Sequence, residues 1–82
     1  MPKGFIINFA KNMTKNDIKK FTEKNNIDAK EEDIETVYNH IKKYCDVFFN
    51  NPIGYIKMLK GKIDDNVYYE ILALYEQYRF YL

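Results

Sequence analysis

The stretch EEDIETVYNHIKKYCDVFF, from Glu31 to Phe49, decides the fold of this chain. Apolar side chains recur along it at alternating steps of three and four residues, which is the spacing of one face of an α-helix. The members of this row are Ile34, Val37, Ile41, Tyr44 and Phe48. A helix with so broad an apolar face is stable only when other helices cover it, so the stretch predicts a helical bundle.

A capping sequence predicts the helix that precedes this central one. Thr14 and Asp17 have the spacing of an N-cap with an acidic partner three residues later, and Asn25-Asn26 is a typical helix end. We therefore expect a helix over about residues 15–24. Its predicted inward side chains are Ile18 and Phe21. Further upstream, residues 4–13 fit either a short helix, which we prefer, or a short strand.

Local signals also place the elements on either side of residue 50. Asp28 and Glu31 repeat the cap-and-acid pattern and predict the start of the central helix. Asn50-Asn51-Pro52 predicts its end and the start of a short helix to about residue 60, because proline is favoured at a first helical position. Gly61 suits the left-handed conformation that terminates such a helix.

The last helix is expected to begin at a cap on Asp64 or Asp65 and to run to about Phe80. Two adjacent apolar rows on it are predicted to cover the central helix. They comprise Val67, Ile71, Leu74, Tyr78, Tyr68, Leu72 and Tyr75. The fold prediction is thus an all-α, small, orthogonal or irregular bundle of four to five helices, two long and the rest short, in a single domain over residues 1–82.

Composition excludes several function classes. The chain has 82 residues and a formal net charge of +1, which argues against a strongly basic nucleic-acid-binding protein. It contains no serine, no glycine-rich phosphate loop and one cysteine, Cys45, so neither a serine nucleophile nor an internal disulfide is available. His40 lacks a partner acid nearby in sequence and is interpreted as a solvated or boundary residue. We expect no enzyme activity, metal or cofactor.

The same composition bears on location. A single cysteine fits a reducing cytoplasm, and no apolar run is long enough to span a membrane. The basic residues up to Ile27 and the acidic residues of 28–49 are expected to pack side by side and neutralise each other. The prediction is a cytoplasmic protein with no membrane partner.

Aromatic side chains outside the two apolar rows of the last helix suggest a function. Tyr69, Phe80 and Tyr81 lie outside or at the margin of the rows on the last helix, and Tyr55 lies beside the inward edge of the short helix. Exposed aromatic residues are frequent anchors in protein interfaces. We therefore expect a non-enzymatic interaction module that binds a protein partner or a second copy of itself through this surface. The alternative is a small nucleic-acid-binding domain whose phosphate contacts are Lys11, Lys15 and Lys19.

The stretch Asn8–Ile27, NFAKNMTKNDIKKFTEKNNI, resembles the opening of a family of small all-helical bacterial proteins of unknown function from bacilli and related low-GC bacteria. The similarity continues loosely to the Leu74-Tyr75 to Tyr78 segment. Cys45, Gly54 and the tyrosine-rich end depart from the family pattern. The resemblance implies a helical fold and a bacterial, cytoplasmic origin, and it implies no activity.

Overall fold

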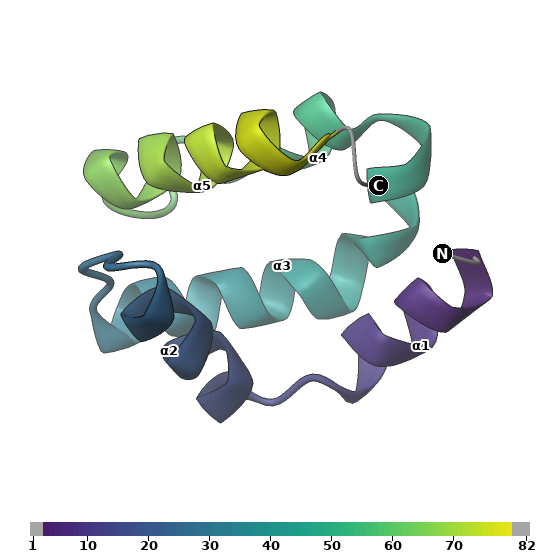
Figure 1. The fold of residues 1–82 in the computed structure, drawn as a ribbon, viewed down its shortest axis with the longest axis horizontal. Coiled ribbons are helices and arrows are strands. Elements are labelled where there is room, and N and C mark those ends of the chain that lie inside the picture. Colours follow the sequence, from purple (N-terminus) through teal and green to yellow (C-terminus); the bar gives the residue numbers. More distant parts are fainter. Residues whose placement is uncertain (1–2, 80–82) are drawn as a thin grey trace.

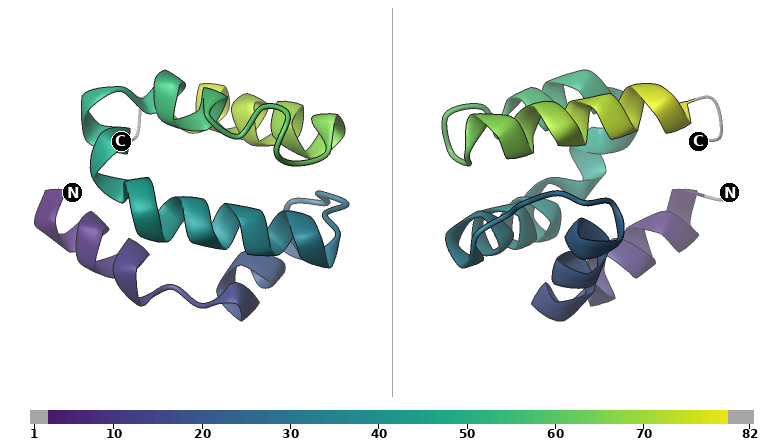
Figure 2. Two further views of the ribbon diagram at one scale, coloured as in Figure 1. Left: turned by 180° about the vertical axis from the view of Figure 1, so that it is seen from behind. Right: turned by 60° about the vertical axis from the view of Figure 1, so that its left-hand side comes forward.

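The computed structural model describes the backbone of residues 3–79, and the side chains of these residues except 3, 5 and 6. The described residues form five helices and no strand, which confirms the all-α prediction. The helices are α1 (Lys3–Asn12), α2 (Lys15–Lys24), α3 (Glu31–Asn50), α4 (Pro52–Lys57) and α5 (Asp65–Tyr78). α3 lies in the middle, with α1 and α2 on one side and α4 and α5 on the other (Figure 1, Figure 2).

The predicted caps account for most helix boundaries. Thr14 accepts a hydrogen bond from the backbone N–H of Asp17 at 3.1 Å, and the Asp17 carboxylate accepts one from the N–H of Thr14 at 2.9 Å. Asn51 begins α4 by accepting from the N–H of Gly54 at 3.0 Å. Gly61 takes the predicted left-handed conformation, with φ at 82°, but α4 ends earlier than predicted, at Lys57. These boundaries follow from local chemistry, so the sequence predicts them well.

The predicted cap of α3 is wrong. The helix begins after Lys30, whose N–H donates to Asp33 Oδ2 at 3.1 Å, and Asp28 takes no part in the cap. Asp33 Oδ1 also accepts from the N–H of Asp64 at 3.2 Å. Asp33 is buried because it joins the starts of α3 and α5, a contact between segments far apart in the sequence.

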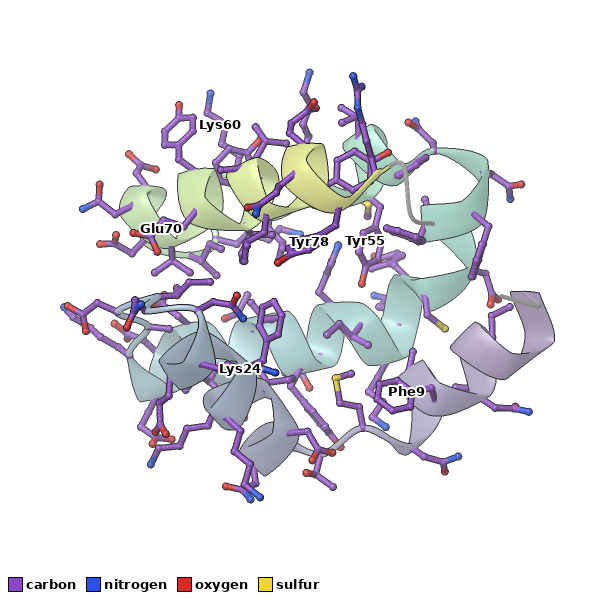
Figure 3. All side chains as sticks on the ribbon, viewed as in Figure 1. Phe9, Lys24, Tyr55, Lys60, Glu70 and Tyr78 are labelled. Atoms are coloured by element: carbon purple, nitrogen blue, oxygen red, sulfur yellow. The ribbon has the colours of Figure 1, made fainter. Side chains whose placement is uncertain are left out.

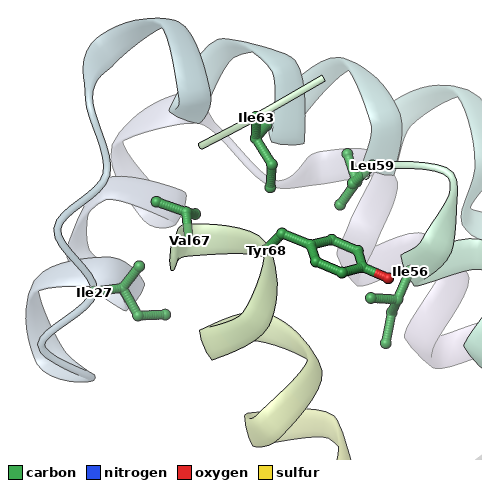
Figure 4. Close-up of a cluster of buried hydrophobic side chains, with 6 residues drawn as sticks. All are labelled: Ile27, Ile56, Leu59, Ile63, Val67 and Tyr68. Atoms are coloured by element: carbon green, nitrogen blue, oxygen red, sulfur yellow. The ribbon is translucent and has the colours of Figure 1, made fainter. Parts of the chain in front are cut away.

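Side chains from three segments form the apolar core. The α2–α3 connection supplies Ile27, the region of α4 supplies Ile56 and Leu59, and α5 supplies Val67 (Figure 4). The complete cluster is Ile27, Ile56, Leu59, Ile63, Val67 and Tyr68. The radius of gyration is 12.0 Å, which is the size of a single compact domain of this length.

The sequence predicts that the two long helices, α3 and α5, pack along their lengths. In the structure they are linked near their ends instead. At one end, Asp33 of α3 binds the residue before α5. At the other, the ring of Phe48 lies 6.3 Å from that of Tyr75, edge to face. Between these two links, the inner sides of α3 and α5 border an open groove. Within residues 3–79, no helix is both long and apolar enough to cross a membrane.

Candidate binding groove

An apolar groove of about 590 Å³ runs between α2, α3 and α5, with α4 closing one end. This volume lies in the range of ~300–1,000 Å³ typical of ligand-binding sites. Aliphatic side chains from four helices line most of it. They are Ile18 of α2, Ile34, Val37 and Ile41 of α3, Ile56 of α4, and Val67 and Ile71 of α5. The groove is therefore the open edge of the apolar core.

Two phenylalanines border the groove on the α1 and α2 side. Phe9 is 63% exposed and Phe21 is 50% exposed, and both line the groove. The sequence pattern predicts an inward Phe21, and the structure shows this to be wrong. Thr22 is buried instead. Its hydroxyl donates to the carbonyl of Lys19 at 2.7 Å, so its burial leaves no unpaired polar group in the core.

The buried polar groups that line the groove already have hydrogen-bond partners. Asp33 accepts from two backbone N–H groups, Thr22 donates to a carbonyl, and His40 is paired with the carbonyl of Tyr55. Among the described residues, no buried side-chain nitrogen or oxygen lacks a partner. The interior of the groove thus offers apolar contact, and its buried polar groups are already used in holding the fold.

The prediction of a solvated or boundary His40 is wrong. His40 is 5% exposed, and its Nε2 lies 2.7 Å from the carbonyl oxygen of Tyr55. A carbonyl only accepts, so Nε2 carries the proton. Burial lowers the pKa of His40 below its usual 6.5 despite this hydrogen bond. Periodicity within α3 could not predict the burial, because it depends on α4 folding back over that helix.

The two flanks of α2 carry lysines in different electrostatic settings. On one flank, Lys15 Nζ lies 3.4 Å from Glu35 Oε1 and Lys19 Nζ lies 3.9 Å from Glu31 Oε1. On the other flank, Lys20 and Lys24 line the groove, and no ion pair involves either of them within the described part of the chain. Helical spacing produces this division, since residues four apart share a face.

One carboxylate lies near the groove lysines. Asp17 also lines the groove. Hydrogen bonds from the backbone and side chain of Thr14 lower the pKa of Asp17, and the charge of Lys20 makes a smaller contribution. The exposed α2 rim therefore carries two lysines against one carboxylate and has one positive charge in excess.

The predicted phosphate contacts do not form a free basic edge. Lys15 and Lys19 lie in ion pairs with acidic residues of α3, in agreement with the expected pairing of the basic and acidic segments. Lys11 lies at the end of α1, and its carbonyl accepts a hydrogen bond from Lys42 Nζ. Two of these three lysines would have to leave carboxylate partners to meet a phosphate.

The predicted aromatic interface is only partly on the described surface. Tyr69 is 53% exposed on α5. Tyr55 packs against the core, with its ring 4.4 Å from that of His40, and burial raises its pKa to about 12. This placement corrects its prediction as a surface anchor. Phe80 and Tyr81 lie outside the described residues.

Cysteine and the acidic residues are possible metal ligands. Cys45 is buried on α3, as expected of a small apolar side chain. In the portion of the chain that is described, no three His, Cys, Asp or Glu side chains lie together in a way that could hold a metal ion.

In comparisons with known proteins, no family model, no curated protein and no solved structure matches this chain. The resemblance to small helical proteins of bacilli stays a prediction. Sequence reasoning misses the groove because its lining residues have the same helical spacing as core residues. Several of them, including Ile18, Ile34 and Val67, are in fact buried. The space between α2 and α5 depends on where those helices lie, and periodicity does not give that.

Proposed function

We propose that this protein is a non-enzymatic interaction module whose groove binds an amphipathic helix of a partner protein. The observation that carries the proposal is the apolar groove of about 590 Å³ bordered by the exposed Phe9 and Phe21. Helix-in-groove recognition places apolar side chains at positions i, i+3, i+4 and i+7 into such a surface. Exposed phenylalanines along the rim would extend the apolar contact beyond the groove itself.

The buried polar side chains of the groove already have hydrogen-bond partners, and this favours an apolar helix face over a polar small molecule as the ligand. A small-molecule site usually combines apolar walls with a few polar groups that orient the ligand. Here Asp33, Thr22 and His40 are already engaged in backbone contacts. The apolar side chains of an amphipathic helix need no such partner, and the helix satisfies its own backbone.

A partner protein also fits better than a second copy of this chain. The large exposed hydrophobic side chains among the described residues are Phe9, Phe21, Tyr69 and Tyr78. The first two belong to the groove. Tyr69 and Tyr78 are nine positions apart and so lie on opposite sides of α5. The described part of the chain therefore presents no exposed apolar helix face that could fill another copy's groove.

The test uses two variants with matched exposure. A displayed library of helix-forming peptides is selected on the wild-type protein, and the enriched peptides are measured against Phe21→Glu and Tyr69→Glu. We expect the selection to enrich amphipathic peptides. Their affinity for Phe21→Glu should be at least tenfold lower than for the wild type, because binding would desolvate the new charge at the apolar rim. Tyr69→Glu should bind them like the wild type. Circular dichroism checks that both variants keep their helices.

Other outcomes contradict the proposal. Failure to enrich amphipathic peptides, or equal binding by wild type and Phe21→Glu, would rule out the groove. Loss of binding only in Tyr69→Glu would instead support the aromatic surface of α5. Concentration-dependent dimerisation abolished by Phe21→Glu would assign the groove to self-association.

Binding of nucleic acid ranks below this proposal, because Lys15 and Lys19 are paired with Glu35 and Glu31. Filter binding at ~50 mM salt, where phosphate contacts are strong, tests it directly. Retention of either single- or double-stranded probes would restore that alternative.

A further inference from the structure

Lys20 and Lys24 give the groove a charged edge with a defined position. They are four residues apart, so their side chains leave the same side of α2. Both line the groove, and neither has an ion-pair partner among residues 3–79. The opposite flank of the same helix differs, since Lys15 and Lys19 there face Glu35 and Glu31.

The other charged residues that line the groove are Asp17 and Asp33. Asp17 offsets one of the two lysines and is held by Thr14. Asp33 is buried at the floor and accepts two backbone hydrogen bonds. α5 contributes only Val67 and Ile71 to the lining, and the charge of Glu70 lies next to this wall, on a polar surface that it shares with Asp28 and Val67. The formal charges of the lining residues therefore sum to zero, but both lysines lie on the α2 wall, which has an excess of one positive charge beside the apolar surface.

We infer that the helix received by the groove is acidic along one flank, with carboxylates about one turn apart that face Lys20 and Lys24. This inference rests on the proposed function and names the chemistry of the partner. Complementary charge at the rim of an interface steers association and selects partners, whereas the apolar contact supplies most of the affinity. The lysine wall would also fix the direction and register of the bound helix.

The probes are two synthetic peptides of equal length with the same apolar face. One carries glutamates at the flanking positions and the other carries lysines. Fluorescence anisotropy measures their affinities for the wild type, for K20E/K24E, and for the control K57E/K60E. Lys57 and Lys60 are exposed and do not line the groove, and Figure 3 shows Lys60 on the far side of the molecule from Lys24.

We expect the wild type to bind the acidic peptide about tenfold more tightly than the basic one, as two exposed ion pairs can provide. K20E/K24E should reverse this preference, and K57E/K60E should keep it. The preference should shrink as salt rises from ~20 to ~500 mM, because exposed charges are screened. Thermal melting confirms that all variants are folded.

Failures of the two proposals are distinguishable. Equal affinity for both peptides, with binding still lost in Phe21→Glu, would overturn the acidic-flank inference and leave the groove intact. A change in K57E/K60E as large as in K20E/K24E would also overturn it, since net charge alone would then explain the preference. Absence of binding by either peptide contradicts the proposed function itself.

Discussion

The apolar core has two edges, which differ in how far their side chains are buried. Toward the α4–α5 connection, Ile63 and Tyr68 are buried and close the core (Figure 4). Toward α2, Phe9 and Phe21 remain exposed, and the core opens into the groove. Both edges are made of similar residue types. The comparison shows that apolar composition alone does not distinguish surface used for folding from surface available for binding.

The largest expected difference between the edges is in stability. Ile63→Ala at the sealed edge removes a side chain that is 7% exposed and should lower the free energy of unfolding by about 2–5 kcal/mol. Phe21→Ala at the open edge should lower it by only about 1 kcal/mol, because Phe21 is 50% exposed and loses about half of the burial of a core phenylalanine. Urea denaturation measures both. Similar losses for the two variants would show that the groove edge is part of the stabilising core.

A larger side chain in the groove should make the open edge contribute more to stability, as the sealed edge does. Val37 lies on α3 and lines the groove, so Val37→Phe would extend an aromatic ring into the open space. We expect a gain of about 0.5–2 kcal/mol in unfolding free energy, as for other cavity-filling changes. The same variant should lose affinity for groove-binding peptides. A destabilised Val37→Phe would mean that the space is too narrow for the ring.

The sealed edge depends on the cap that begins α4. A Cβ atom at Gly54 would collide with the side-chain amide of Asn51, which caps this helix. Gly54→Ala should therefore cost about 1 kcal/mol through loss of the cap, although alanine is the better helix former. Thermal unfolding provides the measurement. Asn51→Ala serves as the control, and the two changes should not be additive, since each removes the same hydrogen bond.

Protonation of His40 should weaken the packing of α4 on α3, where His40 is paired with the carbonyl of Tyr55. The pKa of His40 is lowered in the folded protein, so the unfolded chain takes up a proton more readily. The stabilisation is complete above pH 6.5 and is lost as the pH falls from 6.5 toward the folded-state pKa. His40→Gln should remove this pH dependence between pH 5 and 7, measured by denaturant midpoints. An unchanged slope in the variant would assign the dependence to other groups.

The sequence predicts the features of this fold that are local. Thr14 and Asn51 begin helices through contacts within a few residues, as their patterns predict. Gly61 has the predicted left-handed conformation, although α4 ends before it, at Lys57. His40 and Phe21 are mispredicted because their exposure depends on where other helices lie. The groove escapes prediction for the same reason. Helical periodicity identifies an apolar face, and it contains no information on whether another helix covers that face completely.

One feature at the start of α3 bears on how the fold opens. The two oxygens of the Asp33 carboxylate accept the amide protons of Lys30 and Asp64, so a single side chain anchors the first turns of two helices. Opening of the start of α3 moves Asp33 and so also removes the acceptor of the Asp64 amide. The two amides should therefore exchange with deuterium at similar rates, as members of one cooperative unit, although 31 residues separate Asp33 from Asp64.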